Sequence, residues 1–195
     1  MKPVPGRDAR PERSRRARAR SGGGTPAPRL AEAPEPELAA REALSRSKVE
    51  LGAAPAPLRV LAHAPLATAG VWMATHGILL EGRVPRTTKL LVALGAVSVA
   101  PGAESLRAVF RSALASVEPA ILDDLEKRGE SGRLPERTQR VIAFARRAAL
   151  APAQLTDEDF ALLRRSKLSN AEIAELVALG GLLALWIAIA RATRV

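Results

Sequence analysis

Apolar residues along most of the chain recur at the spacing of an α-helix. From residue 58 onward they return every three or four positions, and no segment sustains the alternation of a β-strand. The pattern predicts about six to seven helices that cover residues 66–80, 87–99, 103–116 and 119–128 and three further segments beginning at Pro135, Thr156 and Asn170. The sequence therefore predicts an all-α fold.

Two of these helices have explicit start signals. Thr156 precedes Asp159 by three residues, and Ser169 precedes Glu172 in the same way, which is the pattern of a capping box. The last predicted helix contains 15 uncharged residues between 176 and 190, fewer than the roughly 20 that span a bilayer. We therefore expect no membrane span but a buried central or subunit-interface helix, and hence a homo-oligomer.

The first 55 residues have a different composition. Residues 1–20 hold eight basic and two acidic side chains, a balance of +6 out of a net charge of +10 for all 195 residues. Three consecutive glycines at 22–24 and frequent prolines follow, and such a mixture buries little apolar surface. We expect 1–55 to be a disordered Arg/Pro/Gly-rich tail, with a short marginal helix in 37–48, and 56–195 to be the folded domain.

The arginine-rich run at residues 14–20 allows three functional interpretations: a nucleic-acid arm, a patch for anionic membranes, and a twin-arginine export signal. An export signal needs an apolar segment after the arginines, whereas glycine, threonine and proline follow here. The nucleic-acid interpretation lacks interleaved aromatic residues for stacking. A solvated tail is the favoured interpretation, nucleic-acid binding through the tail is an alternative, and the expected location is the cytoplasm.

The composition removes several kinds of chemistry. The chain has no cysteine and only two histidines, His63 and His76. Disulfides, thiolate metal ligands and thiol nucleophiles are therefore excluded, and a histidine-rich metal site has almost no ligands to draw on. We expect neither a metal nor a cofactor.

Several segments, taken together, resemble one family. These segments are residues 58–65, 86–94, 140–145, 155–160 and 168–178, and their order and spacing over residues 57–195 are similar to those of the alkylhydroperoxidase D-like and carboxymuconolactone decarboxylase superfamily, in its peroxidase-related branch. The resemblance implies an AhpD-like helical bundle that forms oligomers.

Active members of the peroxidase branch carry a glutamate, a CxxC pair and a histidine at fixed spacing. One thiolate attacks the peroxide, the second cysteine resolves the sulfenic acid, and glutamate and histidine move the protons. The matching positions here are Leu90, Gly102, Ser105 and Val109. None can supply that chemistry, because a serine hydroxyl is far too weakly acidic to replace a thiolate. The resemblance thus implies a non-catalytic scaffold that binds a small apolar ligand or an active relative.

Two residues are candidates for a cysteine-independent, decarboxylase-like activity. His76 follows Trp72 at helical spacing and would line a pocket near the end of the helix 66–80, although a histidine satisfied at a helix end is the plainer interpretation. Glu104 lies within the degenerate motif, where a charge in the first helical turn is the plainer interpretation. His63 is expected to fix a turn.

Overall fold

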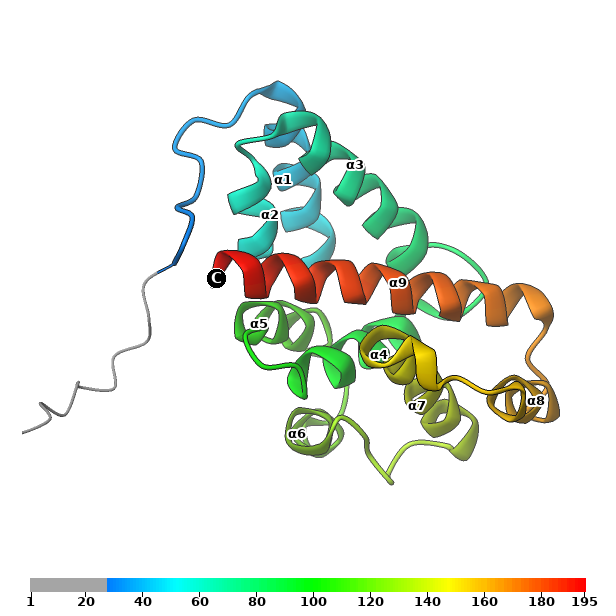
Figure 1. The fold of residues 1–195 in the computed structure, drawn as a ribbon. Coiled ribbons are helices and arrows are strands. Elements are labelled where there is room, and N and C mark those ends of the chain that lie inside the picture. The colour runs from blue at the N-terminus through cyan, green and yellow to red at the C-terminus, as the bar shows by residue number, and fades with distance from the viewer. Residues whose placement is uncertain (1–27) are drawn as a thin grey trace, which may run out of the picture.

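The computed structural model describes residues 28–195, so the arginine-rich run at 14–20 lies outside the described residues. Within them the chain forms helices and no strand, which confirms the all-α prediction (Figure 1). The α-helices are α1 (Leu38–Leu51), α2 (Ala56–Leu61), α3 (Pro65–Thr75), α4 (Arg86–Ser98), α5 (Glu104–Ala113), α6 (Pro119–Arg128), α7 (Glu136–Leu150), α8 (Asp157–Arg165) and α9 (Asn170–Thr193). A π-helical turn (His76–Leu80) extends α3, and a short 3₁₀ turn (Pro152–Gln154) follows α7.

The long helix α9 runs across the molecule, with α1–α3 on one side and α4–α7 on the other (Figure 1). It contributes nine buried residues to the core, including Leu179, Leu183 and Trp186. The indole Nε1 of Trp186 donates a hydrogen bond of 3.1 Å to the Thr75 hydroxyl and so joins α9 to α3. α9 therefore holds the two groups of helices together.

By length and composition, α9 is the one helix in residues 28–195 that is apolar enough to cross a membrane. Half of its most apolar 18-residue window is buried against the rest of the chain. A core helix of a globular protein meets the same test, because it too must be apolar on most of its sides. Its place in the fold is that of the expected buried central helix.

Both predicted capping boxes are present. The Thr156 hydroxyl accepts a hydrogen bond from the Asp159 N–H, and the Asp159 carboxylate accepts one from the Thr156 N–H at 2.9 Å. Ser169 and Glu172 form the same reciprocal pair, with 2.7 Å between the Ser169 nitrogen and the Glu172 carboxylate. These pairs fix the first turns of α8 and α9, since each satisfies otherwise unpaired N–H groups.

The expected tail of residues 1–55 is wrong over residues 38–51, which form the full helix α1 packed on α3. Ala40, Ala43 and Leu51 are buried there, and α1 ends at Gly52 with a left-handed φ of 81°. The segment before α1 is also attached, because the Arg29 N–H donates to the Thr193 carbonyl at 2.9 Å. The sequence predicts only a marginal helix over 37–48, because the buried face of α1 consists mostly of small residues, and packing on α3 supplies the stability that helix propensity does not.

Other differences are small. All seven predicted helices are present, and α1 and α2 bring the number in residues 28–195 to nine. The helix predicted over 66–80 changes to a π-helical turn at His76, and the one predicted to reach residue 116 ends at Ala113. Such one-turn differences are typical of helix ends, where local hydrogen bonds decide the boundary.

Candidate functional site

The positions that the resemblance assigns to the family's catalytic motif lie on α4, in the turn before α5 and on α5. Leu90 and Val109 are buried side chains of the apolar core. Gly102 adopts a left-handed φ of 80° in the turn before α5, and Ser105 lies in the first turn of that helix. In the part of the chain described here, the buried Ser105 hydroxyl has no hydrogen-bond partner.

The end of α9 covers this turn. The Arg191 Nε donates a hydrogen bond of 2.8 Å to the Pro101 carbonyl, and a Cβ added to Gly102 would lie 3.3 Å from the Arg191 Cγ. Glu104 is exposed in the first turn of α5, where its carboxylate accepts a long hydrogen bond of 3.3 Å from the Gly102 N–H. The motif positions therefore form a packed corner that contains neither a thiol nor an imidazole.

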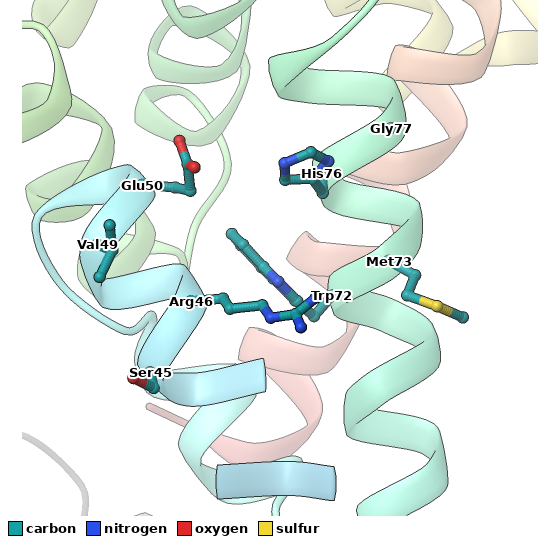
Figure 2. A pocket seen from close by; sticks show the side chains of 8 residues that line it. All are labelled: Ser45, Arg46, Val49, Glu50, Trp72, Met73, His76 and Gly77. Carbon is teal, nitrogen blue, oxygen red and sulfur yellow. The ribbon is translucent and has the colours of Figure 1, made fainter. Parts of the chain in front are cut away.

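A pocket of about 340 Å³ lies between α1 and the end of α3 (Figure 2). Each helix contributes residues at i, i+1, i+4 and i+5, which share one helical face. The pocket is lined by Ser45, Arg46, Val49 and Glu50 of α1 and by Trp72, Met73, His76 and Gly77 of α3 and the π-helical turn. His76, which the sequence offers as a candidate to line a pocket at this end of the helix, is one of these lining residues.

The polar side chains of the pocket differ in how they are held. The Glu50 carboxylate accepts a hydrogen bond of 3.0 Å from Arg86 at the start of α4. Within residues 28–195, Arg46 has no carboxylate within ion-pair distance. Arg46 extends from α1 toward α3, and Trp72 and His76 extend from α3 toward α1 (Figure 2). Arg46 thus brings a positive charge without a partner among the described residues to a pocket with apolar walls.

His76 is the first residue of the π-helical turn. Its Nε2 lies 3.9 Å from a Glu81 carboxylate oxygen, and its ring meets the Trp72 ring edge-on at a centroid distance of 6.2 Å. Single π-helical turns are rare and are found often at functional sites. No hydrogen bond or ion pair in the described residues joins His76 to Glu104, so the two candidates from the sequence do not form one site.

A buried lysine supports the turn that carries His76. Lys89 of α4 is fully buried, and its Nζ donates hydrogen bonds to the carbonyls of Ile78, at 2.9 Å, and Glu81. A carboxylate oxygen of Glu175 on α9 lies 3.4 Å from the same Nζ. Lys89 therefore satisfies carbonyl groups that a π-helical turn leaves without helical partners.

The Glu175 carboxylate also holds the loop after the π-helical turn. It accepts hydrogen bonds from the N–H groups of Arg83, at 2.7 Å, and Val84, at 2.9 Å. Burial raises the pKa of Glu175, but the hydrogen bonds from Val84 and Arg83 and the charge of Lys89 outweigh it and hold the pKa below its ordinary value. Glu175 and Lys89 thus fix the loop and the turn beside the pocket.

Several solved structures have the same arrangement of helices. An uncharacterized peroxidase-related protein from Ralstonia eutropha JMP134, an alkylhydroperoxidase AhpD core, is 18% identical, with a TM-score of 0.63 over 84% of this chain and 90% of that chain. A peroxidase-related protein from Silicibacter sp. TM1040 is 18% identical, with a TM-score of 0.68 over 78% and 81%. The chain has the AhpD-like fold.

A further solved structure with this AhpD-like fold is the debrominase Bmp8. It is a cysteine-to-alanine variant in complex with 2,3,4-tribromopyrrole and is 19% identical, with a TM-score of 0.67 over 78% of this chain and 81% of that chain. No protein-family model and no curated protein matches the sequence. The resemblance drawn from the sequence is therefore confirmed at the level of the fold.

Sequence reasoning missed Arg46 in the pocket and the two residues that support the pocket, Lys89 and Glu175. One signal was available, because Lys89 directly precedes the apolar run at 90–94 and lies on the side of the predicted helix that faces the core. Glu175 comes just before the uncharged stretch at residues 176–190. Only the fold shows that these two residues, 86 positions apart in the sequence, form an ion pair.

Proposed function

We propose that the protein is an AhpD-like scaffold without thiol peroxidase activity that binds a small, largely apolar ligand with an anionic group in the pocket between α1 and α3. The observation that carries this proposal is the pocket itself. Its walls include Val49, Trp72 and Met73, and its cationic lining residue, Arg46, has no carboxylate within ion-pair distance among residues 28–195. Apolar walls with a few placed polar groups are typical of small-molecule sites.

The ligand class follows from the charges. A guanidinium binds a carboxylate or phosphate through paired hydrogen bonds, whereas an uncharged ligand would gain no charge-assisted bond from the exposed Arg46. Glu50 is already bonded to Arg86 and so does not compensate Arg46. A medium-chain carboxylate fits both features, with its alkyl part against the apolar walls and its carboxylate at Arg46.

Intrinsic fluorescence can test this proposal directly. The chain has two tryptophans: Trp72 lines the pocket, and Trp186 lies in the core. Titration with octanoate is expected to change the Trp72 signal in a saturable way, and Trp72→Phe is expected to lose that change. Arg46→Gln should weaken octanoate binding about tenfold, or about 1.4 kcal/mol, and leave the binding of 1-octanol unaltered.

Arg41→Gln is the matched control, because Arg41 lies on the same helix and donates a hydrogen bond to the Pro36 carbonyl, outside the pocket. It should bind octanoate like the natural chain. The absence of a saturable signal with either probe, or equal weakening by Arg41→Gln and Arg46→Gln, would contradict the proposal.

A second candidate function is a cysteine-independent enzyme, favoured by the position of His76 in the pocket wall, 3.9 Å from Glu81. The debrominase Bmp8 has the same fold and is a named enzyme with a small halogenated ring bound. In this chain His76 would act as a general acid or base toward a ligand in the pocket. Glu104 would not assist it, because Glu104 is bonded at the start of α5.

The two functions differ in a turnover assay. An organic hydroperoxide with a dithiol reductant, and separately 2,3,4-tribromopyrrole with the same reductant, are the first substrates to offer. Under the scaffold proposal neither is consumed above background. Turnover that disappears in His76→Gln and persists in Glu104→Gln would favour the enzyme instead.

A further inference from the structure

One face of α9 is apolar and lies at the surface. Its exposed positions form a helical stripe, which we call the α9 outer face: Ala174, Val177, Ala178, Gly181, Leu185 and Ala188. Val177 is 42% exposed and Leu185 43% exposed. No charged residue occurs between Glu175 and Arg191. An uncharged stripe of this length is unusual on a surface helix, which normally carries polar residues on its outer side.

α9 contains two adjacent glycines, Gly180 and Gly181, and the surrounding structure requires a glycine only at the first. A Cβ added to Gly180 would lie 2.5 Å from the Ala148 Cβ, so the packing of α9 on α7 excludes any larger residue there. A Cβ added to Gly181 would have no atom of the chain within 4 Å. Glycine destabilises a helix interior relative to alanine, and nothing in the described fold requires it at 181. The close approach of another backbone would require it.

The α9 outer face is nearly symmetric about Gly181. Large residues, Val177 and Leu185, lie four positions before and after it, and alanines lie three and seven positions away on both sides. In an antiparallel helix pair with a twofold axis at residue 181, each position faces the one at the same distance on the other side of that axis. Val177 would then pack on Leu185 of a second copy, and alanine on alanine.

The dipole of α9 favours the same orientation. The helix has 24 residues, from Asn170 to Thr193. A parallel copy would place the like ends of the two helix dipoles together, whereas an antiparallel copy places opposite ends together.

We propose that the α9 outer face binds a second copy of this chain in an antiparallel, twofold-symmetric pair centred on Gly181. A twofold interface requires a surface that is complementary to itself, and the pattern about Gly181 has that property. The small residues allow the two helix backbones to approach closely, and the large ones pack on either side of the axis.

The absence of cysteine from the chain makes a crosslinking test specific. In the full-length protein, Gly181→Cys is expected to form an intermolecular disulfide under mild oxidation, because the axis brings the residue next to its own copy. Ala174→Cys and Ala188→Cys should each crosslink poorly alone and efficiently when mixed. Efficient crosslinking of Ala174→Cys with itself would indicate a parallel pair and overturn the proposal, as would the absence of crosslinks in Gly181→Cys.

Light scattering on the cysteine-free chain tests the same pair without oxidation. The natural protein is expected to have twice the monomer mass of 20.6 kDa, or a multiple of that dimer. Leu185→Glu should halve the mass. Leu150→Glu is the matched control, because Leu150 is 39% exposed but lies at the end of α7, and it should leave the mass unchanged. Circular dichroism verifies that both variants are folded.

Three outcomes of the scattering experiment would overturn the proposal. The first is a monomeric natural chain, and the second is an equal loss of mass in Leu150→Glu and Leu185→Glu. The third is a dimer that forms only in a variant without residues 1–27, because residues 1–27 of the same chain would then cover the α9 outer face in the full-length protein.

Discussion

Two regions of this AhpD-like fold have opposite characters. On α4 and α5, where the resemblance places the catalytic motif, Leu90 and Val109 fill core positions and Arg191 covers the turn at Gly102. Between α1 and α3, Arg46 and His76 line an open pocket. The first region corresponds to the family's catalytic motif but lacks the side chains that the chemistry needs. The second region lies outside the motif and contains an arginine and a histidine.

The difference shows that the fold does not depend on the motif. Helix packing needs apolar side chains of suitable volume, and leucine and valine meet that need at positions where the family carries acid and imidazole. The pocket region instead depends on polar support from Lys89 and Glu175, which hold the π-helical turn and the loop after it. We therefore expect polar substitutions to have large effects near the pocket and small effects at the motif.

The largest effect is expected from Lys89→Met. The change keeps the side-chain volume but leaves the Ile78 and Glu81 carbonyls without their donor and Glu175 without its cation. Removing one partner of a buried pair is strongly destabilising, and we expect a loss of about 3 kcal/mol in the free energy of unfolding. Urea denaturation followed by tryptophan fluorescence measures it. Lys48→Met on the exposed side of α1 is the control, and an equal loss there would refute the special role of Lys89.

A smaller effect, with a defined pH dependence, is expected from Glu175→Gln. The pKa of Glu175 lies below its ordinary value in the folded state. Its stabilising contribution is therefore present above the unfolded-state pKa and is lost as the pH falls through the folded-state pKa. At pH 7 the variant should be less stable by about 1 to 2 kcal/mol, because the charge of Lys89 then lacks its partner.

This difference between the natural chain and Glu175→Gln should shrink as the pH is lowered from 7 toward 3. Urea midpoints at each pH measure it. Glu104→Gln at the motif is the control, and it should change stability little at any pH, because the Glu104 carboxylate is exposed and makes one long hydrogen bond of 3.3 Å. A Glu175→Gln effect that does not vary with pH would contradict the assigned ion pair.

Gly102→Ala probes the motif region through the backbone. Gly102 has a φ of 80°, which alanine adopts at a cost, and the added Cβ would lie 3.3 Å from the Arg191 Cγ. We expect a loss of about 1 kcal/mol, measured as a lower urea midpoint. Gly132→Ala, where an added Cβ meets no atom within 4 Å, should have a smaller effect. The same strain opposes a cysteine at position 102, so restoring the CxxC pair would not by itself restore an active site.

The sequence alone predicted the features that depend on local residue patterns. The capping boxes at Thr156 and Ser169, and helices with strong apolar periodicity such as α5 and α7, follow from spacing alone. It was insufficient where stability comes from distant partners. α1 has a weak apolar stripe and is stabilised by packing on α3, and the ion pair of Lys89 with Glu175 joins α4 to α9. His76 could be placed beside a pocket, but Arg46 could not, because α1 itself was assigned to the tail.

The smallest effect, and the one of opposite sign, is expected from Ser105→Ala. The resemblance places Ser105 at the position of the second cysteine of the motif, and its buried hydroxyl has no hydrogen-bond partner within residues 28–195. A buried hydroxyl without a partner has lost its hydrogen bonds to water, so its removal should leave the free energy of unfolding unchanged or raise it by up to about 1 kcal/mol. Ser131→Ala is the contrasting control, because the Ser131 hydroxyl donates a hydrogen bond of 2.9 Å to Asp124 and its loss should destabilise the fold. If Ser105→Ala instead destabilised the protein or abolished ligand binding, the Ser105 hydroxyl would have a structural or binding role. The contrast between the motif region and the pocket would then be wrong.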